Sequence, residues 1–303
     1  MKVLVTGAKG FIGQHVSDFF SKQGHVVIEC DRQFDFKKSN NKSVIIDLTD
    51  IEQVRRILKE EKPEVIIHCA GLADVNESLK EPYLDYESNV TVTHNLLFIL
   101  HECALNKCKF IFLSSASVYG NPDALPICEA AETHPVSPYA LHKLMCENAC
   151  LYFHENYNMD IKILRIFSAY GEGLKKQIFW DMFNKVQITG KLCMFGTGNE
   201  SRDYINIKDL LQAVYLIVQN APYEEVIYNV ANGEEITIRQ VAEEFADIIN
   251  LPKENIHFSG ENKEGNPINW KADISKLQRL GYCKSVKLKD GISSYLNWLR
   301  KSI

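Results

Sequence analysis

The sequence has no C-x-x-C pair among its nine cysteines, and it has no apolar run long enough to cross a membrane. The missing pairs argue against a zinc ribbon or a thioredoxin-type redox site. Several cysteines lie inside apolar runs such as VIIHCAG, where a free thiol behaves as a small hydrophobic side chain. The N-terminus also lacks the cleavage site of a signal peptide. We therefore expect a soluble cytoplasmic protein with reduced thiols and no membrane partner.

An excess of positive charge is also missing. The chain has 34 lysines and arginines against 39 aspartates and glutamates, a formal net charge of -5. Nucleic-acid-binding proteins normally carry a basic face, so no nucleic-acid partner is predicted. There is no internal repeat and no low-complexity tract. The 303 residues are 46% hydrophobic and 24% charged, which is typical of a globular chain of one large or two moderate domains.

The first half of the chain alternates between short apolar runs and helical patterns. Strands are expected at 3–6, 25–30, 43–47, 65–70, 110–115 and 161–167, and helices at 11–23, 50–63, 83–101 and 139–157. Such unalternating apolar strands, separated by helices, predict parallel strands covered on both faces. The expected fold is α/β, with a doubly wound parallel (Rossmann-type) sheet.

After about residue 168 the elements become shorter and turn residues become denser, which indicates a smaller C-terminal α/β lobe. The predicted dinucleotide-binding domain spans 1–168, with 202–221 returning to it. Residues 169–201 and 222–303 are predicted to form the nucleotide-sugar-binding lobe.

Three glycines, Gly7, Gly10 and Gly13, recur at every third position just after the first strand. Glycine permits a positive φ and lets a pyrophosphate approach the backbone at the positive end of a helix. The last glycine allows the helix to pack closely on the strand. A glycine-rich turn without a ligand is the alternative interpretation. A dinucleotide is favoured because the second strand ends in Asp31, whose carboxylate can accept hydrogen bonds from the adenosine ribose.

The residues around Asp31 favour NAD as the cofactor over NADP. A carboxylate repels the 2′-phosphate of NADP, whereas the neighbouring Arg32 would attract it, so NADP stays the alternative. Asp47 and Leu48 follow the third strand and are placed to meet the adenine edge. Capping of the next helix is the other interpretation of Asp47.

Tyr139 and Lys143, in SPYALHK, lie four residues apart at the start of a helix and so project from one face. An adjacent ammonium is expected to lower the phenol pKa from its usual value of about 10 by stabilising the phenolate. Ser114 and Ser115 end the strand FIFLSS, at the sheet edge where doubly wound folds bind ligands. A serine hydroxyl there can hydrogen-bond the oxygen of an alcohol that Tyr139 deprotonates while a hydride leaves for a nicotinamide.

Together these motifs resemble the extended short-chain dehydrogenases/reductases of the NAD-dependent nucleotide-sugar epimerase/dehydratase family. The resemblance runs nearly end to end, through TGAKGFIG, VIIHCAG, SSASVYG, SPYALHK, LRIFSAYG, ESRDYINIKDL and KADISKLQRLGY. It implies a nucleotide-diphosphate sugar as the substrate. It also implies that Ser115 is the catalytic serine, that Tyr139 is the acid/base and that Lys143 is its partner.

The resemblance implies the remaining site residues as well. The expected cofactor contacts are Gly7, Gly10, Phe11, Ile12, Gly13, Asp31, Arg32, Asp47, Leu48, His68, Ala70, Asn89, Ser114, Tyr139 and Lys143. The expected substrate contacts are Ser115, Ser168, Arg202 and Lys263, and no metal site is expected. The Arg202 guanidinium suits a diphosphate. Without the resemblance, His68 would be interpreted as a core histidine and Arg202 as part of a surface ion pair.

Departures from the family pattern narrow the reaction. Ala116 and Ser117 stand where the 4,6-dehydratases carry an Asp and a Glu, which argues against a dehydratase. Ser168 stands where 4-epimerases commonly have an asparagine, a mark against a standard UDP-galactose 4-epimerase. Lys263 falls near the position at which many relatives have a second diphosphate-binding arginine. Lysine lacks the planar guanidinium that binds a phosphate through two N–H groups at once.

We predict an NAD-dependent nucleotide-sugar 4-epimerase that acts through a 4-keto intermediate by hydride transfer. An NAD(P)H-dependent 4-keto-sugar reductase and an NAD-dependent 4-dehydrogenase are the enzymatic alternatives. A regulatory dinucleotide-binding protein is the non-enzymatic alternative, and the intact Ser115, Tyr139 and Lys143 argue against it. A role in polysaccharide biosynthesis is an expectation from the family alone.

A homodimer is expected because the family usually joins the helices at about 83–101 and 139–157 of two subunits. In this chain these helices carry more apolar residues than one inward face needs, namely Leu96, Leu97, Leu100, Leu144 and Leu151. Packing of both helices on their own sheet is the alternative.

Overall fold

The computed structural model describes residues 1–33, 41–261 and 268–302, and the chain divides into two compact units. The first unit comprises Met1–Gly120, Thr133–Ile166 and Val214–Tyr228, and the second comprises Asn121–Glu132, Phe167–Ala213 and Asn229–Ile303. The boundaries of these units are not the same as those of the predicted domains. The segment 121–132 clusters with the second unit, and the part that returns to the first unit is 214–228 instead of 202–221.

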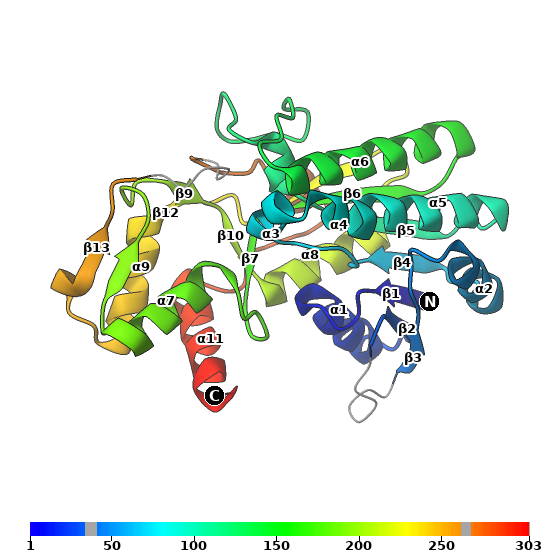
Figure 1. Ribbon diagram of the computed structural model, residues 1–303. Coiled ribbons are helices and arrows are strands. Elements are labelled where there is room, and N and C mark those ends of the chain that lie inside the picture. Colours follow the sequence, from blue (N-terminus) through cyan, green and yellow to red (C-terminus); the bar gives the residue numbers. More distant parts are fainter. Residues whose placement is uncertain (34–40, 262–267, 303) are drawn as a thin grey trace. The chain divides into compact units, whose positions relative to one another are not determined.

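A seven-stranded parallel sheet forms the centre of the fold, in the order β11-β6-β5-β4-β1-β2-β3 (Figure 1). Its strands are β1 (Lys2–Thr6), β2 (Val26–Asp31), β3 (Lys42–Ile45), β4 (Val65–His68), β5 (Lys109–Ser115), β6 (Ile161–Ile166) and β11 (Ile227–Val230). The order reverses at β1, from which the chain proceeds to β2 on one side and later to β4 on the other. Such a switch point is where doubly wound sheets bind ligands.

Helices cover both faces of this sheet, as the alternating pattern predicts. They are α1 (Phe11–Lys22), α2 (Ile51–Glu61), α3 (Val75–Lys80), α4 (Pro82–Tyr86), α5 (Val92–Glu102), α6 (Pro138–Tyr157) and α8 (Ile207–Asn220). In Figure 1, α5 and α6 lie over one face of the sheet and α1 over the other. The rings of Phe19 and Phe20 on α1 contact Tyr215 of α8. Within the described part of the chain, no helix is long and apolar enough to span a membrane.

Local sequence signals explain where these helices begin. Asp50 caps α2 by accepting hydrogen bonds from the backbone N–H groups of residues 52 and 53. Ser137 caps α6 in the same way, and Pro138 supplies the fixed φ that suits a first helical position. By contrast, Gly10 precedes α1 without any side-chain cap. The first N–H groups of α1 are therefore not occupied by a capping side chain.

The helix predicted at 83–101 is interrupted. A π-helical turn (η1, Glu87–Thr91) separates α4 from α5. The Asn89 amide lies inside this turn and donates to the carbonyl oxygens of Asp85 and Leu72. Such turns break a regular helical period that the apolar pattern alone does not reveal, and they often occur near functional sites.

The second unit contains three two-stranded sheets, β7–β10, β9–β12 and β8–β13. Its strands are β7 (Ser168–Tyr170), β8 (Leu192–Met194), β9 (Ser201–Arg202), β10 (Tyr204–Asn206), β12 (Ile236–Thr237) and β13 (Ile256–Phe258). Its remaining helices are α7 (Gln177–Thr189), α9 (Ile238–Ile249), α10 (Ser275–Arg279) and α11 (Leu288–Ser302). Buried Asp203 joins its loops by accepting hydrogen bonds from the backbone N–H groups of Asn232 and Ala272.

Candidate active site

The glycine turn between β1 and α1 is built from close backbone contacts. Gly7 has a φ of 62°, and a Cβ on it would lie 2.7 Å from the Ala70 backbone. A Cβ on Gly13 would lie 2.1 Å from the Gly7 carbonyl oxygen. The Gly10 N–H donates to that same oxygen at 2.9 Å. Only glycine fits the first and last of these positions, which explains the spacing found in the sequence.

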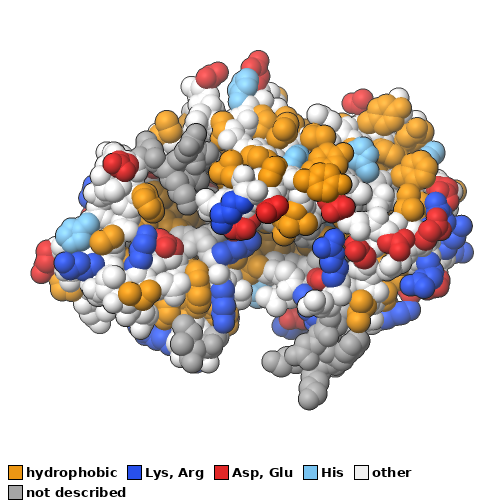
Figure 2. Space-filling model, in the orientation of Figure 1, with side chains coloured by type: hydrophobic (Ala, Val, Ile, Leu, Met, Phe, Trp, Pro, Cys, Tyr) orange, Lys and Arg blue, Asp and Glu red, His pale blue; other side chains and the backbone are white. Residues whose placement is uncertain are grey.

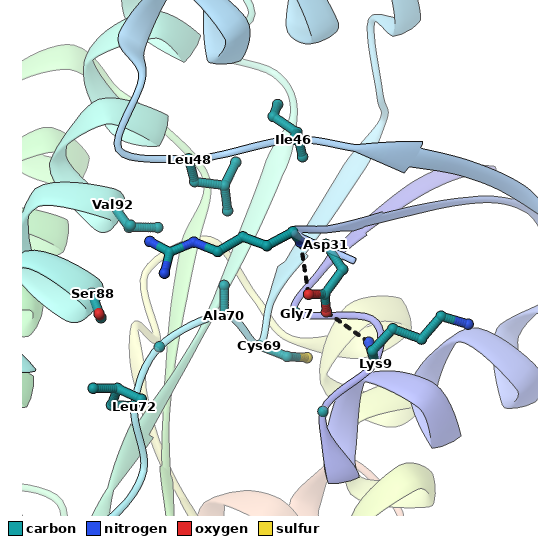
Figure 3. A pocket seen from close by; sticks show the side chains of 13 residues that line it. Gly7, Lys9, Asp31, Ile46, Leu48, Cys69, Ala70, Leu72, Ser88 and Val92 are labelled. Carbon is teal, nitrogen blue, oxygen red and sulfur yellow. Dashed lines mark hydrogen bonds between the residues drawn. The ribbon is translucent and has the colours of Figure 1, made fainter. Parts of the chain in front are cut away.

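A pocket of about 390 Å³ opens beside this turn at the carboxyl ends of β1, β2 and β4. Of the predicted cofactor residues, it is lined by Gly7, Gly10, Asp31, Arg32, Leu48 and Ala70 (Figure 3). The pocket thus combines a glycine cradle, a helix N-terminus without a side-chain cap and a carboxylate. These features fit the pyrophosphate and ribose of a dinucleotide.

Asp31 is held at the pocket by the backbone. Its carboxylate accepts hydrogen bonds from the N–H groups of Lys9 at 2.8 Å and Arg32 at 2.7 Å (Figure 3). The Arg32 guanidinium lies 3.4 Å from the Asp47 carboxylate. The pKa of the Asp47 carboxyl lies below its usual value. Burial acts to raise this pKa, but the hydrogen bonds from Thr49 and the nearby Arg32 lower it by more. Asp47 is not among the described residues that line the pocket, so it anchors Arg32 from outside.

Sequence reasoning missed more than half of the pocket lining. The missed residues are Lys9, Ile46, Cys69, Gly71, Leu72, Ser88 and Val92. Most of them are immediate neighbours of predicted residues, as Cys69 and Gly71 are of Ala70. Ser88 comes from the π-helical turn and precedes the predicted Asn89, whereas Val92 starts α5 and no short motif marks it.

His68, at the end of β4, is buried between two threonines. Its Nδ1 lies 2.7 Å from Thr6 Oγ1, and its Nε2 lies 3.1 Å from Thr93 Oγ1. Thr93 Oγ1 donates onward to the Asn89 carbonyl, so it accepts from His68 Nε2–H. Burial, together with the charge of Lys143, lowers the pKa of His68 to about 3. His68 is therefore a neutral link between β1, β4 and α5 and is not part of the described pocket lining.

The three predicted catalytic residues come together at the end of β5 and the start of α6. The Ser115 and Tyr139 side chains are hydrogen-bonded to each other. Ser115 Oγ also accepts the Ser117 N–H at 3.2 Å, and the Tyr139 N–H donates to Ser78 at 3.2 Å. Lys143 Nζ lies 5.9 Å from the centre of the Tyr139 ring. The spacing of four residues thus places both helical side chains beside the strand end, as the sequence predicted.

The ionisation of Tyr139 differs from the sequence expectation. Burial raises the pKa of its phenol to about 12, with Asp85 and Cys146 adding to the increase and the hydrogen bond to Ser115 opposing it. Lys143 is not among the groups that shift the pKa of Tyr139. Its Nζ donates to the Leu113 carbonyl at 3.0 Å. Burial lowers the pKa of Lys143 itself.

The Ser114 side chain has different partners from that of the neighbouring Ser115. Its hydroxyl donates to Glu147, which is 1% exposed and also accepts two N–H groups of Arg165 from β6. The Arg165 guanidinium in turn lies 4.7 Å from the centre of the Tyr119 ring. This buried network joins the end of β5, next to Ser115, to α6 and β6. Sequence reasoning missed Glu147 and Arg165, and each alone resembles an ordinary surface charge.

Of the predicted substrate residues that the structure describes, Ser168 and Arg202 lie in the second unit and Ser115 lies in the first. The Ser168 N–H donates to the Asp203 carbonyl at 3.0 Å. Arg202 Nη1 donates to the carbonyls of Ser201 and Ile268, and its guanidinium lies 5.5 Å from the Trp270 ring centre. Lys263 lies outside the described residues. The structure therefore orients Arg202 firmly within its own unit.

Two further predicted cofactor residues, Phe11 and Ile12, form the first turn of α1 without lining the described pocket. Asn89 is buried beside this pocket, where its side-chain amide donates a hydrogen bond to the backbone carbonyl of Leu72. Among the described residues, no group of three or more His, Cys, Asp or Glu side chains is placed to hold a metal ion.

Comparisons with known proteins agree with this architecture. Residues 3–231 match the NAD dependent epimerase/dehydratase family. A putative UDP-glucose 4-epimerase of Methanocaldococcus jannaschii is 30% identical over 99% of this chain and 99% of its own length. The similar curated proteins include UDP-sugar 4-epimerases and dTDP-D-glucose 4,6-dehydratases.

Solved structures match over the whole chain. A UDP-glucose 4-epimerase from Thermotoga maritima, solved with UDP-glucose, is 26% identical, with a TM-score of 0.89 over 100% of this chain and 99% of that one. A UDP-glucuronic acid 4-epimerase from Bacillus cereus, in complex with UDP-glucuronic acid and NAD, is 25% identical. Its TM-score is also 0.89, and the match covers 100% of both chains.

Proposed function

Because this chain belongs to the NAD-dependent epimerase/dehydratase family, we propose that it is a nucleotide-sugar 4-epimerase that uses NAD. One observation carries the proposal: Ser115, Tyr139 and Lys143 converge in the unit that also holds the glycine-lined pocket. Relatives named as UDP-sugar 4-epimerases support the choice of reaction and suggest UDP as the nucleotide.

NAD would be held by the turn at Gly7 and Gly10, with Asp31 beside its adenosine ribose and Leu48 among the apolar lining. When bound, NAD supplies the hydride acceptor and donor. In its phenolate form, the Tyr139 side chain would take the proton from the sugar C4 hydroxyl, while Ser115 hydrogen-bonds the same oxygen. After the keto sugar presents its other face, Tyr139 returns the proton to the oxygen. This cycle requires Tyr139 to act as base and acid in turn.

Substrate contacts outside the catalytic cluster are proposed at Ser168, Arg202 and Lys263. Arg202 is supported by its side chain, which is a preoriented guanidinium held by two carbonyls. A dehydratase is disfavoured because Ala116 and Ser117 follow Ser115 and neither side chain can serve as the acid or base for loss of water.

A one-way NADPH-dependent 4-keto-sugar reductase is the second candidate. The observation that favours it is Arg32, a pocket-lining guanidinium that could meet a 2′-phosphate. Its partner Asp47 and the neighbouring Asp31 both oppose that assignment, so NAD is preferred.

The deciding experiment begins with the protein as purified. Any bound nucleotide is released and identified. The protein is then incubated with UDP-glucose, UDP-galactose, UDP-N-acetylglucosamine and UDP-glucuronic acid, and separately with a UDP-4-keto sugar and NADH or NADPH. Products are followed by NMR and reduced nicotinamide by absorbance. Retained NAD with inversion at C4 and no net reduction supports the epimerase. Stoichiometric consumption of NADPH or NADH with a 4-keto sugar would replace it with the reductase.

The matched control is Tyr139→Phe, which removes only the hydroxyl. Turnover should fall about 10³-fold, in the range expected for a general acid/base, while folding and NAD binding persist. Full turnover in Tyr139→Phe would overturn the catalytic assignment.

We also propose a homodimer formed through the face of α4, α5 and α6. Leu96, Leu97 and Leu100 are buried in their own core, so they do not supply this face. Instead the exposed apolar side chains on these helices are Tyr83, Leu84, Tyr86, Phe98, Leu141 and Tyr152. Figure 2 shows hydrophobic side chains gathered over this region. Analytical ultracentrifugation should give a dimer that Leu141→Lys dissociates, and a monomer at micromolar concentration would contradict the proposal.

A further inference from the structure

A buried histidine links two segments that line the dinucleotide pocket. His68 Nδ1 lies 2.7 Å from Thr6 Oγ1 on β1, and His68 Nε2 lies 3.1 Å from Thr93 Oγ1 on α5. The Ala70 N–H donates to Thr6 Oγ1 at 3.2 Å, and Thr93 Oγ1 donates to the Asn89 carbonyl at 2.7 Å. The two threonines and the histidine are each at most 1% exposed. These contacts form one continuous chain of hydrogen bonds, which we call the His68 chain.

The donor and the acceptor of each hydrogen bond in the His68 chain can be assigned. The single hydroxyl proton of Thr93 goes to the Asn89 carbonyl, so Thr93 Oγ1 accepts the N–H of His68 Nε2. Burial lowers the pKa of His68 to about 3, so the ring is neutral and its Nδ1 carries no proton. Nδ1 therefore accepts from the Thr6 hydroxyl, whose oxygen accepts the Ala70 N–H. Only the Nε2–H tautomer of His68 satisfies the whole chain.

Both ends of the His68 chain adjoin residues that line the pocket. Ala70 lines the pocket itself, and a Cβ on Gly7 would lie 2.7 Å from the Ala70 backbone. At the other end, Asn89 follows the pocket-lining Ser88 in η1, and its side-chain amide donates to the carbonyl of the pocket-lining Leu72 at 3.1 Å. Figure 3 shows Ala70, Leu72 and Ser88 at this pocket. The chain therefore holds the segment after β4 between the glycine turn and η1.

The segment after β4 depends on Thr6 because the strand pairing ends there. β1 and β4 pair in parallel register up to Thr6 and His68. Beyond this pair the Thr6 carbonyl accepts the Cys69 N–H at 3.2 Å, and the Thr6 hydroxyl accepts the Ala70 N–H. The orientation of that hydroxyl is set in turn by His68 Nδ1, which accepts its proton. Without this acceptor the Ala70 backbone could shift against Gly7, at the turn on which a pyrophosphate would lie.

We propose that His68 is a positioning residue for the dinucleotide pocket, whose Nε2–H tautomer, held between Thr6 and Thr93, fixes Ala70 and η1 in place for the cofactor. His68 is outside the described pocket lining, so it acts through its two threonines. A pocket that is already ordered loses less conformational entropy when its ligand binds, so the His68 chain should affect cofactor affinity as well as stability. This inference rests on the cofactor binding in the proposed function.

The test compares paired substitutions at the two threonines in protein dialysed free of nucleotide. Thr6→Val and Thr93→Val each remove the hydroxyl at nearly constant shape, whereas Thr6→Ser and Thr93→Ser keep it. Tyr295→Phe is the matched control, because it removes a similarly buried hydroxyl that donates to the Leu174 carbonyl at 2.6 Å in the second unit. Calorimetric titration with NAD gives the affinity of each variant, and urea denaturation gives its stability.

The tautomer of His68 provides a second measurement that needs no change in the chain. ¹⁵N NMR of the parent protein with labelled histidine distinguishes a protonated from an unprotonated ring nitrogen. The signals of His68 are assigned by their loss in His68→Gln. Near neutral pH we expect a protonated Nε2 and an unprotonated Nδ1, as the His68 chain requires.

Both valine variants should bind NAD about tenfold more weakly than the parent, and both serine variants should stay within about threefold of it. Tyr295→Phe should lose stability and keep the NAD affinity of the parent. Valine variants that lose stability and keep the parent's affinity would overturn the proposal, because the His68 chain would then serve the fold alone. A protonated Nδ1 in the parent would overturn it as well. If Thr6→Val does not fold, Thr93→Val and the tautomer decide.

Failure of this inference can be told apart from failure of the proposed function. The titration needs no sugar, so its result is the same whether the enzyme is an epimerase or a reductase. A parent protein that binds no dinucleotide would contradict the proposed function and this inference with it. A parent that binds NAD as tightly as both valine variants do would contradict this inference alone.

Discussion

Two buried lysines at opposite ends of the same sheet have different surroundings. Lys162, at the start of β6, has a side chain that is 0% exposed, and its Nζ meets the carbonyls of Pro222 and Tyr223 and the carboxylate of Asp160, at 2.7, 3.0 and 3.1 Å. Lys143, beside the end of β5, donates to the Leu113 carbonyl, and within the described residues it makes no ion pair.

This difference indicates that the buried charge of Lys162 is structural and that of Lys143 is functional. An ammonium has three N–H donors, and three acceptors surround that of Lys162. Lys143 has donors left over, in the cluster with Tyr139 and Ser115. Burial without a full set of partners is costly, so it is expected where a ligand completes the set. We infer that the amino end of the sheet stabilises the fold, whereas the carboxyl end is prepared for ligands.

The largest expected effect is a loss of stability at the carboxyl end of the sheet, where structural charges also occur. Glu147 and Arg165 lie there too, but they are fully paired, so they should behave structurally like Lys162. Glu147→Gln leaves the Arg165 charge buried without its partner and should lower the free energy of unfolding by about 3–5 kcal/mol. Urea denaturation measures this. Glu102→Gln, which breaks the exposed pair with Arg55, is the control and should cost at most about 1 kcal/mol.

A smaller effect is the change in stability of the protein with pH. The pKa of His68 is lowered to about 3 in the folded protein, against 6.5 for the unperturbed group. The unfolded chain therefore binds a proton that the folded protein does not, and stability falls as pH drops through 6.5 toward 3. Between pH 7 and pH 5 this group should remove about 2 kcal/mol. The same pH drop should cost His68→Gln about 2 kcal/mol less, and equal losses would exclude His68 as the source.

The smallest predicted effect concerns the pocket. Asp31→Asn removes the carboxylate that repels a 2′-phosphate and leaves Arg32 in place. The ratio of NADP to NAD affinity should rise about tenfold, equivalent to 1.4 kcal/mol. Calorimetric titration with both dinucleotides tests this, and Asp18→Asn on α1 is the control. A ratio that stays constant would mean that Asp31 does not face the ribose.

Much of this organisation could be predicted from the sequence because local patterns determine it. The apolar runs located the strands of the sheet, and the glycine spacing located the turn at Gly7 and Gly13. The Tyr139–Lys143 spacing placed both residues on one helical face beside Ser115.

The parts that could not be predicted depend on contacts between distant residues. Thr6 and His68 are 62 positions apart, and Glu147 and Arg165 are 18 apart, so neither pair is marked by a local pattern. The π-helical turn that separates α4 from α5 is equally invisible in an apolar pattern. The increase in the pKa of Tyr139 arises from burial, which only the packed structure determines.

The most direct measurement of the central claim exchanges the two lysines for methionine, one at a time, and records both unfolding free energy and kcat. We expect Lys162→Met to lose about 2–4 kcal/mol of stability with turnover per folded molecule preserved, because carbonyls and Asp160 lose their partner. Lys143→Met should stay within about 1 kcal/mol of the parent and lose at least about 10²-fold in turnover. Equal losses of stability in both variants, or full turnover in Lys143→Met, would contradict the account.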